Sequence, residues 1–349
     1  MADKKENISE RKEEHLRICL NEEISFKEKS AGFEKYEFEH YAITEVDINS
    51  IDLSTDFFAK KISYPFMISC MTGGSSGAVN INQQLAIAAR SLNIPIGVGS
   101  QRQMLENDEF KNSFKIVRKE AGNSPVLGNI GAAQIVKEKN PVDLIKNLVS
   151  VIEADAMVIH VNPLQELIQK SGESNFKGFI KAVEKICNSV SVPIIVKEVG
   201  AGISEIAAKN LLDAGVKGID VSGAGGTSWS AVELLRNNSP EDEIFRDWGL
   251  PTSYCIRHVH ELKTNHSFML IASGGINSGM DTAKSLALGG DIAASAKAVL
   301  KMVDHSGTEG VIKMIEDWFE IVKKIMYLTG AQDLKNFNRS KLIKTEELY

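Results

Sequence analysis

Short runs of apolar and β-branched residues recur along the chain, and each run ends in glycine, serine, asparagine or a charged residue. The eight runs cover residues 65–70, 95–100, 125–131, 156–162, 193–200, 218–223, 268–275 and 291–300. Between them lie stretches with apolar residues at helical spacing, at residues 80–92, 108–121, 141–152, 175–188, 204–214, 281–288 and 309–328. The pattern predicts strands that alternate with helices. Strands that are apolar throughout are typical of a parallel sheet covered on both faces.

Two folds have this order of elements, a closed (β/α)8 barrel and an open doubly wound sheet. Eight units over roughly 250 residues match the size of the barrel. The open sheet usually has a G-x-G-x-x-G turn after its first strand. The first strand here is followed by Met71-Thr72-Gly73-Gly74, which lacks that spacing. We therefore predict an α/β protein, a (β/α)8 TIM barrel with an N-terminal extension.

Segments outside this repeat divide the chain further. We predict an N-terminal extension over residues 1–64 with a basic helix at 9–21, a barrel over residues 65–330 and a C-terminal tail over residues 331–349. The connection after the sixth strand, residues 227–264, is long for a βα unit, and long connections in compact domains are usually functional. It is therefore a candidate lid.

Composition and charge exclude several classes of function. The formal net charge of −6 argues against a nucleic-acid or anionic-membrane binder, although a few local Lys and Arg residues suffice for a small anionic substrate. The cysteines, Cys19, Cys70, Cys187 and Cys255, form no CxxC pair, so a zinc site or a disulfide framework is not expected. Free thiols fit a reducing compartment. With no secretory signal and no run of 18 apolar residues, we expect a cytoplasmic protein.

Polar residues gather where the predicted strands end. In a barrel the active site lies at the C-terminal ends of the strands, so these side chains should converge on one mouth. They are Met71, Thr72, Gly73, Ser100, Gln101, Arg102, Asn129, His160, Asn162, Gln165, Glu166, Lys197, Glu198, Ser222, Thr227, Gly274, Gly275, Asn277, Ala294 and Ser295.

The ends of the seventh and eighth strands predict a phosphate site. Residues 272–279 read ASGGINSG and lead from a strand into a helix, and the eighth strand ends in Ala294-Ser295-Ala296. Glycines let a phosphate approach backbone N–H groups, and the positive end of a helix favours the anion. The alternative is an ordinary glycine-rich turn with a helix cap.

Lys197 ends a fully apolar strand and needs a charge partner or open water, because an unpaired buried ammonium is costly. We favour an anionic cofactor edge as that partner. An ion pair with Glu198 or another neighbour, and a Schiff-base lysine, are the alternatives.

The segment from His160 to Glu166 places four polar side chains within seven residues. His160 and Asn162 point the same way, because side chains alternate along a strand. Glu166 can bind Mg²⁺ together with substrate phosphates. The alternatives are a core histidine with a local hydrogen bond and a glutamate that stabilises a helix N-terminus.

Arg11, Lys12 and His15 form a basic cluster on the N-terminal helix, with Arg11 and His15 four residues apart on one face. Alone, this pattern favours a solvated surface helix. It acquires a function only if the helix folds over a barrel mouth and meets a diphosphate.

Taken together, these motifs resemble a known family. In chain order they are Arg11-Lys12-x-x-His15, Met71-Thr72-Gly73-Gly74, Gly99-Ser100, Asn129, His160-Val161-Asn162, Gln165-Glu166, Val196-Lys197-Glu198-Val199-Gly200, Asp220-Val221-Ser222-Gly223, Gly225-Gly226-Thr227, Trp248-Gly249 and Ala272-Ser273-Gly274-Gly275. From residue 11 to about 300 the chain is similar to the type 2 isopentenyl diphosphate isomerases. The resemblance implies an FMN-binding barrel that interconverts isopentenyl and dimethylallyl diphosphate. It further implies Mg²⁺, a reduced flavin that acts as an acid–base group, NADPH as the usual reductant, and tetramers or octamers.

The same resemblance assigns roles by position. FMN is expected at Cys70, Met71, Thr72, Ser100, Asn129, Lys197, Ser222, Thr227, Gly275, Ile276, Asn277, Ala294 and Ser295. The substrate is expected at Arg11, Lys12, His15, Ser100, Gln101, Arg102, His160, Asn162 and Gln165. Mg²⁺ is expected at Glu166, and the catalytic side chains are expected to be His160, Gln165 and Lys197.

Two positions depart from the family. It usually has Arg where this chain has Asn277, and Gly where this chain has Ala294. Loss of a guanidinium removes a bidentate phosphate contact, and an added methyl group crowds the backbone. We therefore expect weaker flavin binding with the fold retained, and tighter binding after Asn277→Arg.

Other barrels share parts of these motifs. An α-hydroxy-acid oxidase resembles the chain at Val196-Lys197 and at Ser273-Gly274-Gly275, but it needs a basic His after the sixth strand, and residues 222–227 contain none. An inosine monophosphate dehydrogenase-like barrel needs a nucleophilic Cys in that loop, and residues 227–230 contain none. A non-enzymatic flavin- or phosphate-binding barrel is the third alternative.

Overall fold

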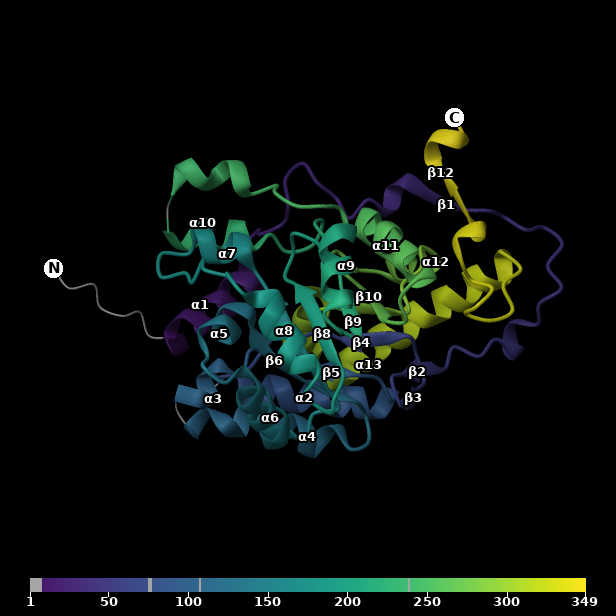
Figure 1. Cartoon of the computed structure of the whole chain (residues 1–349). Helices are drawn as coiled ribbons and strands as arrows, with labels where there is room; N and C mark the ends of the chain where they lie inside the picture. Colours follow the sequence, from purple (N-terminus) through teal and green to yellow (C-terminus); the bar gives the residue numbers. More distant parts are fainter. Residues whose placement is uncertain (1–7, 75–76, 107, 238) are drawn as a thin grey trace.

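Eight parallel strands close into a barrel at the centre of the computed structural model, which describes residues 8–74, 77–106, 108–237 and 239–349 (Figure 1). The strands are β4 (Phe66–Ile68), β5 (Ile96–Gly97), β6 (Val126–Gly131), β7 (Ala156–Val161), β8 (Ile194–Glu198), β9 (Gly218–Asp220), β10 (Met269–Ser273) and β11 (Ile292–Ser295). They follow the chain order around the barrel, and β11 pairs with β4 to close it. The predicted (β/α)8 fold is confirmed, because every predicted strand supplies one barrel strand.

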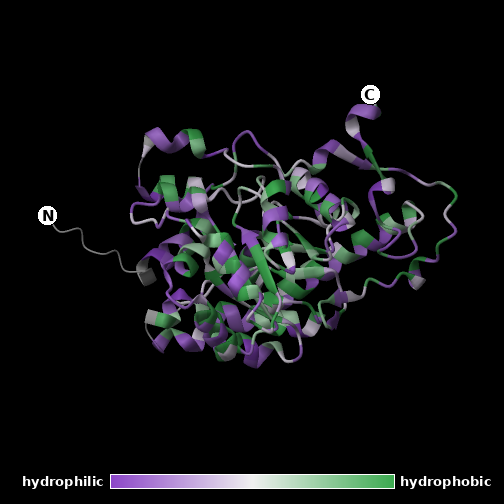
Figure 2. Ribbon diagram, in the orientation of Figure 1, coloured by the Kyte–Doolittle hydropathy of each residue, from purple (hydrophilic) through white to green (hydrophobic). Residues whose placement is uncertain are grey.

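Helices surround the barrel and bury their apolar faces against it. They are α2 (Ala78–Leu92), α3 (Arg102–Glu106), α4 (Lys111–Ala121), α5 (Ala132–Lys137), α6 (Pro141–Ile152), α7 (Pro163–Ile168), α8 (Phe179–Cys187), α9 (Glu205–Asp213), α10 (Trp229–Asn237), α11 (Thr252–Glu261), α12 (Gly279–Ala287) and α13 (Lys297–Leu328). In Figure 2 the strand arrows are mainly hydrophobic and the helices around them mix both colours. No helix within the described ranges is both long and apolar enough to span a membrane.

The predicted eighth strand is too long. Residues 291–300 were expected to be one strand, but β11 stops at Ser295 and α13 starts at Lys297. A short apolar run does not distinguish a strand from a buried helix, and Val299, Leu300 and Val303 are buried on the inner face of α13. The helix continues through a kink at Gly307 (φ 63°), so the predicted helix at 309–328 is its second part.

The long connection after β9 is largely helical. It contains α10 and α11, and Cys255, Ile256 and Val259 of α11 are buried against the barrel core. Ala231 and Val232 of α10 pack instead against the N-terminal extension. The idea of a lid over the site stays a prediction.

The N-terminal extension contacts both ends of the barrel. The hairpin of β2 (Thr55–Phe57) and β3 (Lys60–Ile62) leads directly into β4, so it lies at the N-terminal ends of the strands. Phe57 and Ile62 are buried in one cluster with inward-facing barrel residues such as Met67 and Ile195. Farther along the extension, β1 (Tyr36–Phe38) pairs with β12 (Leu342–Lys344) of the C-terminal tail. The helix α1 (Ile8–Asn21), predicted at 9–21, lies across the opposite end of the barrel.

Candidate active site

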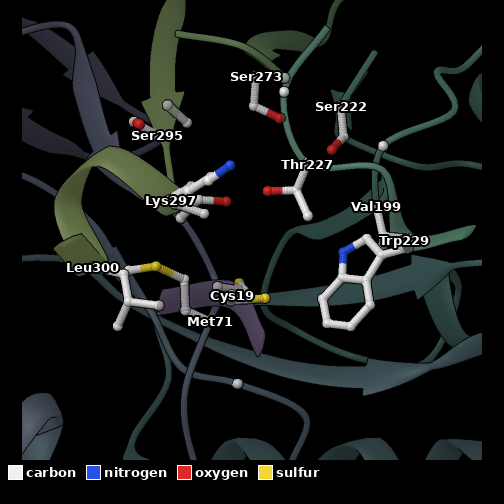
Figure 3. A pocket seen from close by; sticks show the side chains of 18 of the residues that line it. Cys19, Met71, Val199, Ser222, Thr227, Trp229, Ser273, Ser295, Lys297 and Leu300 are labelled. Atoms are coloured by element: carbon white, nitrogen blue, oxygen red, sulfur yellow. The ribbon is translucent and has the colours of Figure 1, made fainter. Parts of the chain in front are cut away.

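A cavity of about 660 Å³ opens at the C-terminal ends of the barrel strands. Small-molecule sites usually enclose roughly 300–1,000 Å³. Residues at or just after the ends of all eight strands form its wall: Ser69 and Cys70, Ser100, Asn129, His160, Lys197, Ser222, Ser273, and Ala294 with Ser295. Figure 3 shows several of these side chains converging on the same space, together with residues of α1, α10 and α13. Most of the polar residues predicted at the strand ends therefore line one cavity.

The turn after β10 depends on glycine. Gly274 and Gly275 adopt φ angles of 100° and 74°, a left-handed region that other residues rarely occupy. A Cβ atom on Gly226 would lie 2.6 Å from the backbone nitrogen of Gly275, so the loop after β9 packs closely against this turn. The helices α12 and α13 both begin on this side of the cavity, where their N-terminal ends favour an anion.

Lys197 reaches the cavity and is paired within the barrel. Its Nζ donates a hydrogen bond of 2.8 Å to the carbonyl oxygen of Glu198 and lies 3.6 Å from Oδ2 of Asp220. Asp220 is fully enclosed, and its Oδ1 accepts a hydrogen bond from Ser273. Burial raises the pKa of Asp220, and the charge of Lys197 opposes that rise. Lys197 therefore lines the cavity and also forms an ion pair with a neighbouring residue. Such an ion pair was one of the alternatives considered from the sequence.

The side chain of Glu198 turns away from Lys197. Its Oε2 accepts hydrogen bonds from the backbone N–H groups of Val199, Gly200, Ala201 and Gly202. Glu198 therefore shapes the loop after β8, and Asp220 is the carboxylate that faces Lys197.

His160 borders the cavity, and its hydrogen bonds select one tautomer of the ring. Its Nδ1 lies 2.8 Å from Oδ1 of Asn129, while Nδ2 of Asn129 donates to the carbonyl of Val98 at 3.2 Å. The second bond orients the amide, so His160 donates from Nδ1 and keeps a lone pair on Nε2. Burial lowers the pKa of His160 to about 4, with contributions from the charges of Lys197 and Lys12. The imidazole is therefore neutral at pH 7.

Glu233 of α10 connects three polar side chains at the edge of the cavity. Its Oε1 accepts hydrogen bonds of 3.0 Å from His15 and from Gln165, and its Oε2 accepts one of 2.7 Å from Arg236. Burial alone would raise the pKa of Glu233, but these hydrogen bonds and charges outweigh it and lower the pKa. His15 also meets the edge of Trp229, with ring centroids 5.2 Å apart.

The basic helix α1 covers the mouth of its own barrel. Nζ of Lys12 donates to the carbonyl oxygens of Gly73 at 2.7 Å and Ser100 at 3.0 Å. His15, Leu16 and Cys19 continue the cavity wall on the same face of the helix. This helix is therefore part of the site, although its sequence alone favoured a solvated surface.

Sequence comparison identifies the family to which this geometry belongs. The profile of a family described as FMN-dependent dehydrogenase matches residues 4–113 and 160–344. A protein of Chlorobium limicola named isopentenyl-diphosphate delta-isomerase is 45% identical over 358 aligned residues, which cover 98% of each chain. One of the same name from Vibrio parahaemolyticus is 44% identical and covers 95% of this chain and 98% of the relative. The chain belongs to the type 2, FMN-dependent isopentenyl-diphosphate delta-isomerases.

Solved structures that resemble this isomerase-family chain show the shared fold. A variant of flavocytochrome b2 with pyruvate bound superposes with a TM-score of 0.70 at 16% identity, over 95% of this chain and 82% of that one. A mandelate oxidase gives a TM-score of 0.66 at 15% identity, over 95% of this chain and 94% of that one. Both likenesses support the barrel, and at this identity they carry nothing about the reaction.

Most residues that the sequence assigned to an isomerase-family site line the cavity. They are Lys12, His15, Cys70, Met71, Thr72, Ser100, Asn129, His160, Gln165, Lys197, Ser222, Thr227, Gly275, Ile276, Asn277, Ala294 and Ser295. The lining does not include Arg11, Gln101, Arg102, Asn162 or Glu166.

Gln101 and Arg102 have contacts that hold the surrounding backbone and loops. Gln101 is fully buried, and its side chain accepts from the N–H of Asn129 at 2.9 Å and donates to the carbonyl of Leu148 at 3.1 Å. Arg102 pairs with Glu173 at 3.2 Å. Gln101 directly follows Ser100, which does line the cavity.

Asn162 and Glu166 form an oxygen-rich pair behind Gln165. Nδ2 of Asn162 donates to Oε1 of Glu166 at 3.0 Å and to Oε1 of Gln165 at 2.9 Å. Oδ1 of Asn162 is buried and accepts no hydrogen bond from any residue in the described ranges. Within those ranges no three His, Cys, Asp or Glu side chains form a metal cluster. A metal at this pair would therefore need oxygens from a ligand as well.

Sequence reasoning assigned no role to four side chains that the structure brings to the site. Glu233 and Trp229 lie on α10, inside a segment interpreted as a long loop, so no strand end pointed to them. Asp220 was quoted only within a motif, and its pairing with Lys197 follows from the register of β8 and β9. Lys297 was placed inside the predicted eighth strand, although it begins α13 and lines the cavity.

Proposed function

We propose that this chain interconverts isopentenyl and dimethylallyl diphosphate, with FMN, Mg²⁺ and NADPH as the flavin reductant. One observation carries the proposal. A single cavity joins the glycine turn after β10 and the small residues at the end of β11 to a second polar group on α1 and β7, which comprises Lys12, His15 and His160. Such a cavity suits two phosphorylated ligands side by side, a flavin nucleotide at the turns and a diphosphate below α1.

The side of the cavity formed by β10 and β11 fits FMN. The loops after β9 and β10 pack backbone to backbone at Gly226 and Gly275, where a Cβ atom would clash, and two helix N-termini lie on this side of the cavity. Lys197 supplies a cation to the cavity from the end of β8, where it would favour negative charge on the flavin ring. Reduced FMN would supply the acid–base group for the allylic carbon, with no net redox change.

The side below α1 fits a magnesium diphosphate. Lys12 and His15 reach the cavity from α1, where they would contact the phosphate oxygens. Mg²⁺ is usually held by one or two carboxylates plus substrate phosphates. The Glu166 carboxylate is a ligand of that kind, and Asn162 links it to Gln165, which lines the cavity.

The residues around the reacting carbons would orient the substrate and exclude water. Neutral His160 offers an unprotonated Nε2, and its other nitrogen is fixed by Asn129. Gln165 is held from α10 by Glu233, which places its amide against the cavity. Val199 and Trp229 supply apolar wall beside these groups, as an isoprenoid chain requires (Figure 3).

Two rival chemistries find less support at this site. Burial raises the pKa of the Cys19 and Cys70 thiols to about 11 and about 12, so neither is a thiolate nucleophile at pH 7. Cys255 lies buried in α11 and outside the cavity lining. The histidines of the lining are His15 from α1 and His160 from β7, rather than one from the loop after β9 as an α-hydroxy-acid oxidase needs.

Anaerobic assay of the purified protein tests the proposal. With isopentenyl diphosphate, FMN and Mg²⁺, we expect dimethylallyl diphosphate to form after reduction by dithionite or NADPH and not with oxidised flavin. Glu166→Gln should abolish the dependence of turnover on Mg²⁺. Glu153→Gln, at the exposed end of α6, should leave that dependence unchanged. Flavin binding without turnover would overturn the proposal, and oxygen consumption with a 2-hydroxy acid would support the oxidase instead.

The proposal includes assembly into tetramers or octamers, as in the family that the sequence resembles. Light scattering after size exclusion should give a mass of four or eight times 38.2 kDa. A monomer at micromolar concentration would contradict this part alone.

A further inference from the structure

A lysine that the mechanism above does not use points into the cavity. Lys297 is the first residue of α13, two positions after β11 ends at Ser295, and it lines the cavity. Figure 3 shows its amine directed into the open space, on the side where Ser273, Ser295 and Thr227 also lie. Its side chain is half-buried.

Within the part of the chain that the structure describes, no partner of the Lys297 amine accounts for its position. Among the residues described by the structure, none forms a hydrogen bond or ion pair with its Nζ. The groups facing it are Lys301, the carboxylate of Glu23 and the thiol of Cys19, and Glu23 already accepts from the N–H of Ser25 at 2.9 Å. A half-buried ammonium without a partner is costly, so a bound anion is its expected counterpart.

The turn after β10 supplies no cation of its own. Asn277 is exposed, and its amide donates to the carbonyl of Gly275 at 3.2 Å. Its N–H donates to Oδ2 of Asp281 at 3.1 Å, so the turn carries a carboxylate close to where an anion would bind. A phosphate here therefore needs positive charge from another element.

We propose that Lys297 supplies the charge that pairs with the phosphate of FMN, in place of a basic residue in the turn after β10. The inference rests on the proposed binding of FMN. It explains how a glycine turn with an uncharged Asn277 can hold a dianionic phosphate, because the start of α13 adds a full charge to the partial charge of its helix end.

Comparison of FMN with riboflavin isolates the phosphate. Fluorescence titration of the flavin-free protein gives both dissociation constants. Lys297→Met should weaken FMN binding by about tenfold or more, since hydrogen bonds between charged groups are stronger than those between neutral groups. Riboflavin binding, which involves no phosphate, should change by less than about twofold. Lys297→Arg should retain most of the FMN affinity.

A matched control lies on the same helix. Lys313 is exposed on α13 and paired with Asp317, so Lys313→Met should leave both flavin affinities unchanged. A double-mutant cycle adds a second readout. Asn277→Arg should tighten FMN binding more in the Lys297→Met background than in the wild type, because the two cations would serve one phosphate.

Each outcome has a defined meaning. Equal weakening of FMN and riboflavin by Lys297→Met, or no change in either, overturns the role of Lys297 while the function stands. A raised KM for isopentenyl diphosphate with unchanged FMN affinity overturns it too, and assigns Lys297 to the substrate. A wild-type protein that binds neither flavin overturns the proposed function itself, and the inference with it.

Discussion

His160, Lys197 and Glu233 are ionisable side chains at the barrel mouth, and each is held by a different kind of neighbour. Asn129 fixes one nitrogen of His160, while burial and the nearby charges of Lys197 and Lys12 lower the pKa of the ring and keep it neutral. Asp220 faces Lys197 across two adjacent strands, whereas Glu233 gathers donors from α1, α7 and α10. In each case the neighbour fixes the orientation of the side chain.

The state of His160 makes stability depend on pH. Its folded pKa of about 4 lies below the unfolded value of 6.5, so the unfolded chain binds the proton first. The associated stability is fully present above pH 6.5 and is lost as the pH falls to about 4, up to about 3 kcal/mol. Urea unfolding at pH 7 and pH 4 should therefore differ less in His160→Gln than in the wild type.

An exposed histidine provides the control for this experiment. His40 lies on the surface of the extension, so His40→Gln should keep the wild-type difference between the two pH values. The same pH difference in His160→Gln as in the wild type would contradict a neutral imidazole at the cavity wall.

Glu233 should contribute to both stability and turnover. Glu233→Gln keeps the size of the side chain but removes the charge opposite Arg236 and one acceptor shared by His15 and Gln165. Because Arg236 keeps its contact with Glu14, we expect a loss of roughly 1–3 kcal/mol rather than unfolding. The melting temperature and kcat/KM should both fall. Glu241→Gln, an exposed change nearby, should alter neither.

The residues of the site divide into those that the sequence could indicate and those that it could not. Side chains at strand ends, such as Asn129 and Lys197, were predictable, because a barrel brings all strand ends to one mouth. Gln101 was predicted for the same reason, yet it turns inward to hold the backbone of Asn129. Glu233 and Lys297 were not predictable, because each depends on where a helix starts and how it packs.

At the scale of elements, α1 is the segment whose place the sequence could not determine. Its periodicity predicted the helix, but its basic face was equally compatible with solvent. Ile18 and Ile24 resolve this, since they are buried against Ala231 and Val232 of α10. The long connection after β9 therefore provides the surface against which the N-terminal helix packs.

Disruption of this contact should separate substrate binding from flavin binding. Ile18→Asp places a charge in the apolar contact between α1 and α10, and undocking of α1 would expose that charge to water. Without Lys12 and His15 at the mouth, KM for isopentenyl diphosphate should rise roughly tenfold or more. FMN affinity should change little, because the flavin side lies on the barrel strands.

Arg17→Asp is the matched control, since it introduces the same residue one position earlier on the exposed face of α1. An equal rise in KM in both variants would mean that charge on the helix, and not its docking, affects the substrate.

At the scale of the whole molecule, the N-terminal extension and the C-terminal tail lie outside the βα repeat of the barrel and pair with each other. The eight βα units were predictable from apolar periodicity, because each unit is local in sequence. The pairing of β1 with β12 joins residues about three hundred positions apart. Neither strand is apolar enough to be predicted from the sequence. The stack of Phe38 on Phe337, 5.6 Å between centroids, reinforces that pairing.

The β2–β3 hairpin closes the end of the barrel opposite the cavity, so stability and activity should be separable there. Phe57 is 2% exposed and packs among inward-facing barrel residues such as Met67 and Ile195. Phe57→Ala leaves a void that rigid strands cannot fill, and we expect a loss of about 3–5 kcal/mol in urea unfolding. KM, kcat and FMN affinity should stay close to wild type at temperatures where the variant is folded. Ile43→Ala, 76% exposed on the same extension, should change none of these values. Altered KM in Phe57→Ala without a loss of stability would show instead that the hairpin communicates with the cavity through the barrel interior.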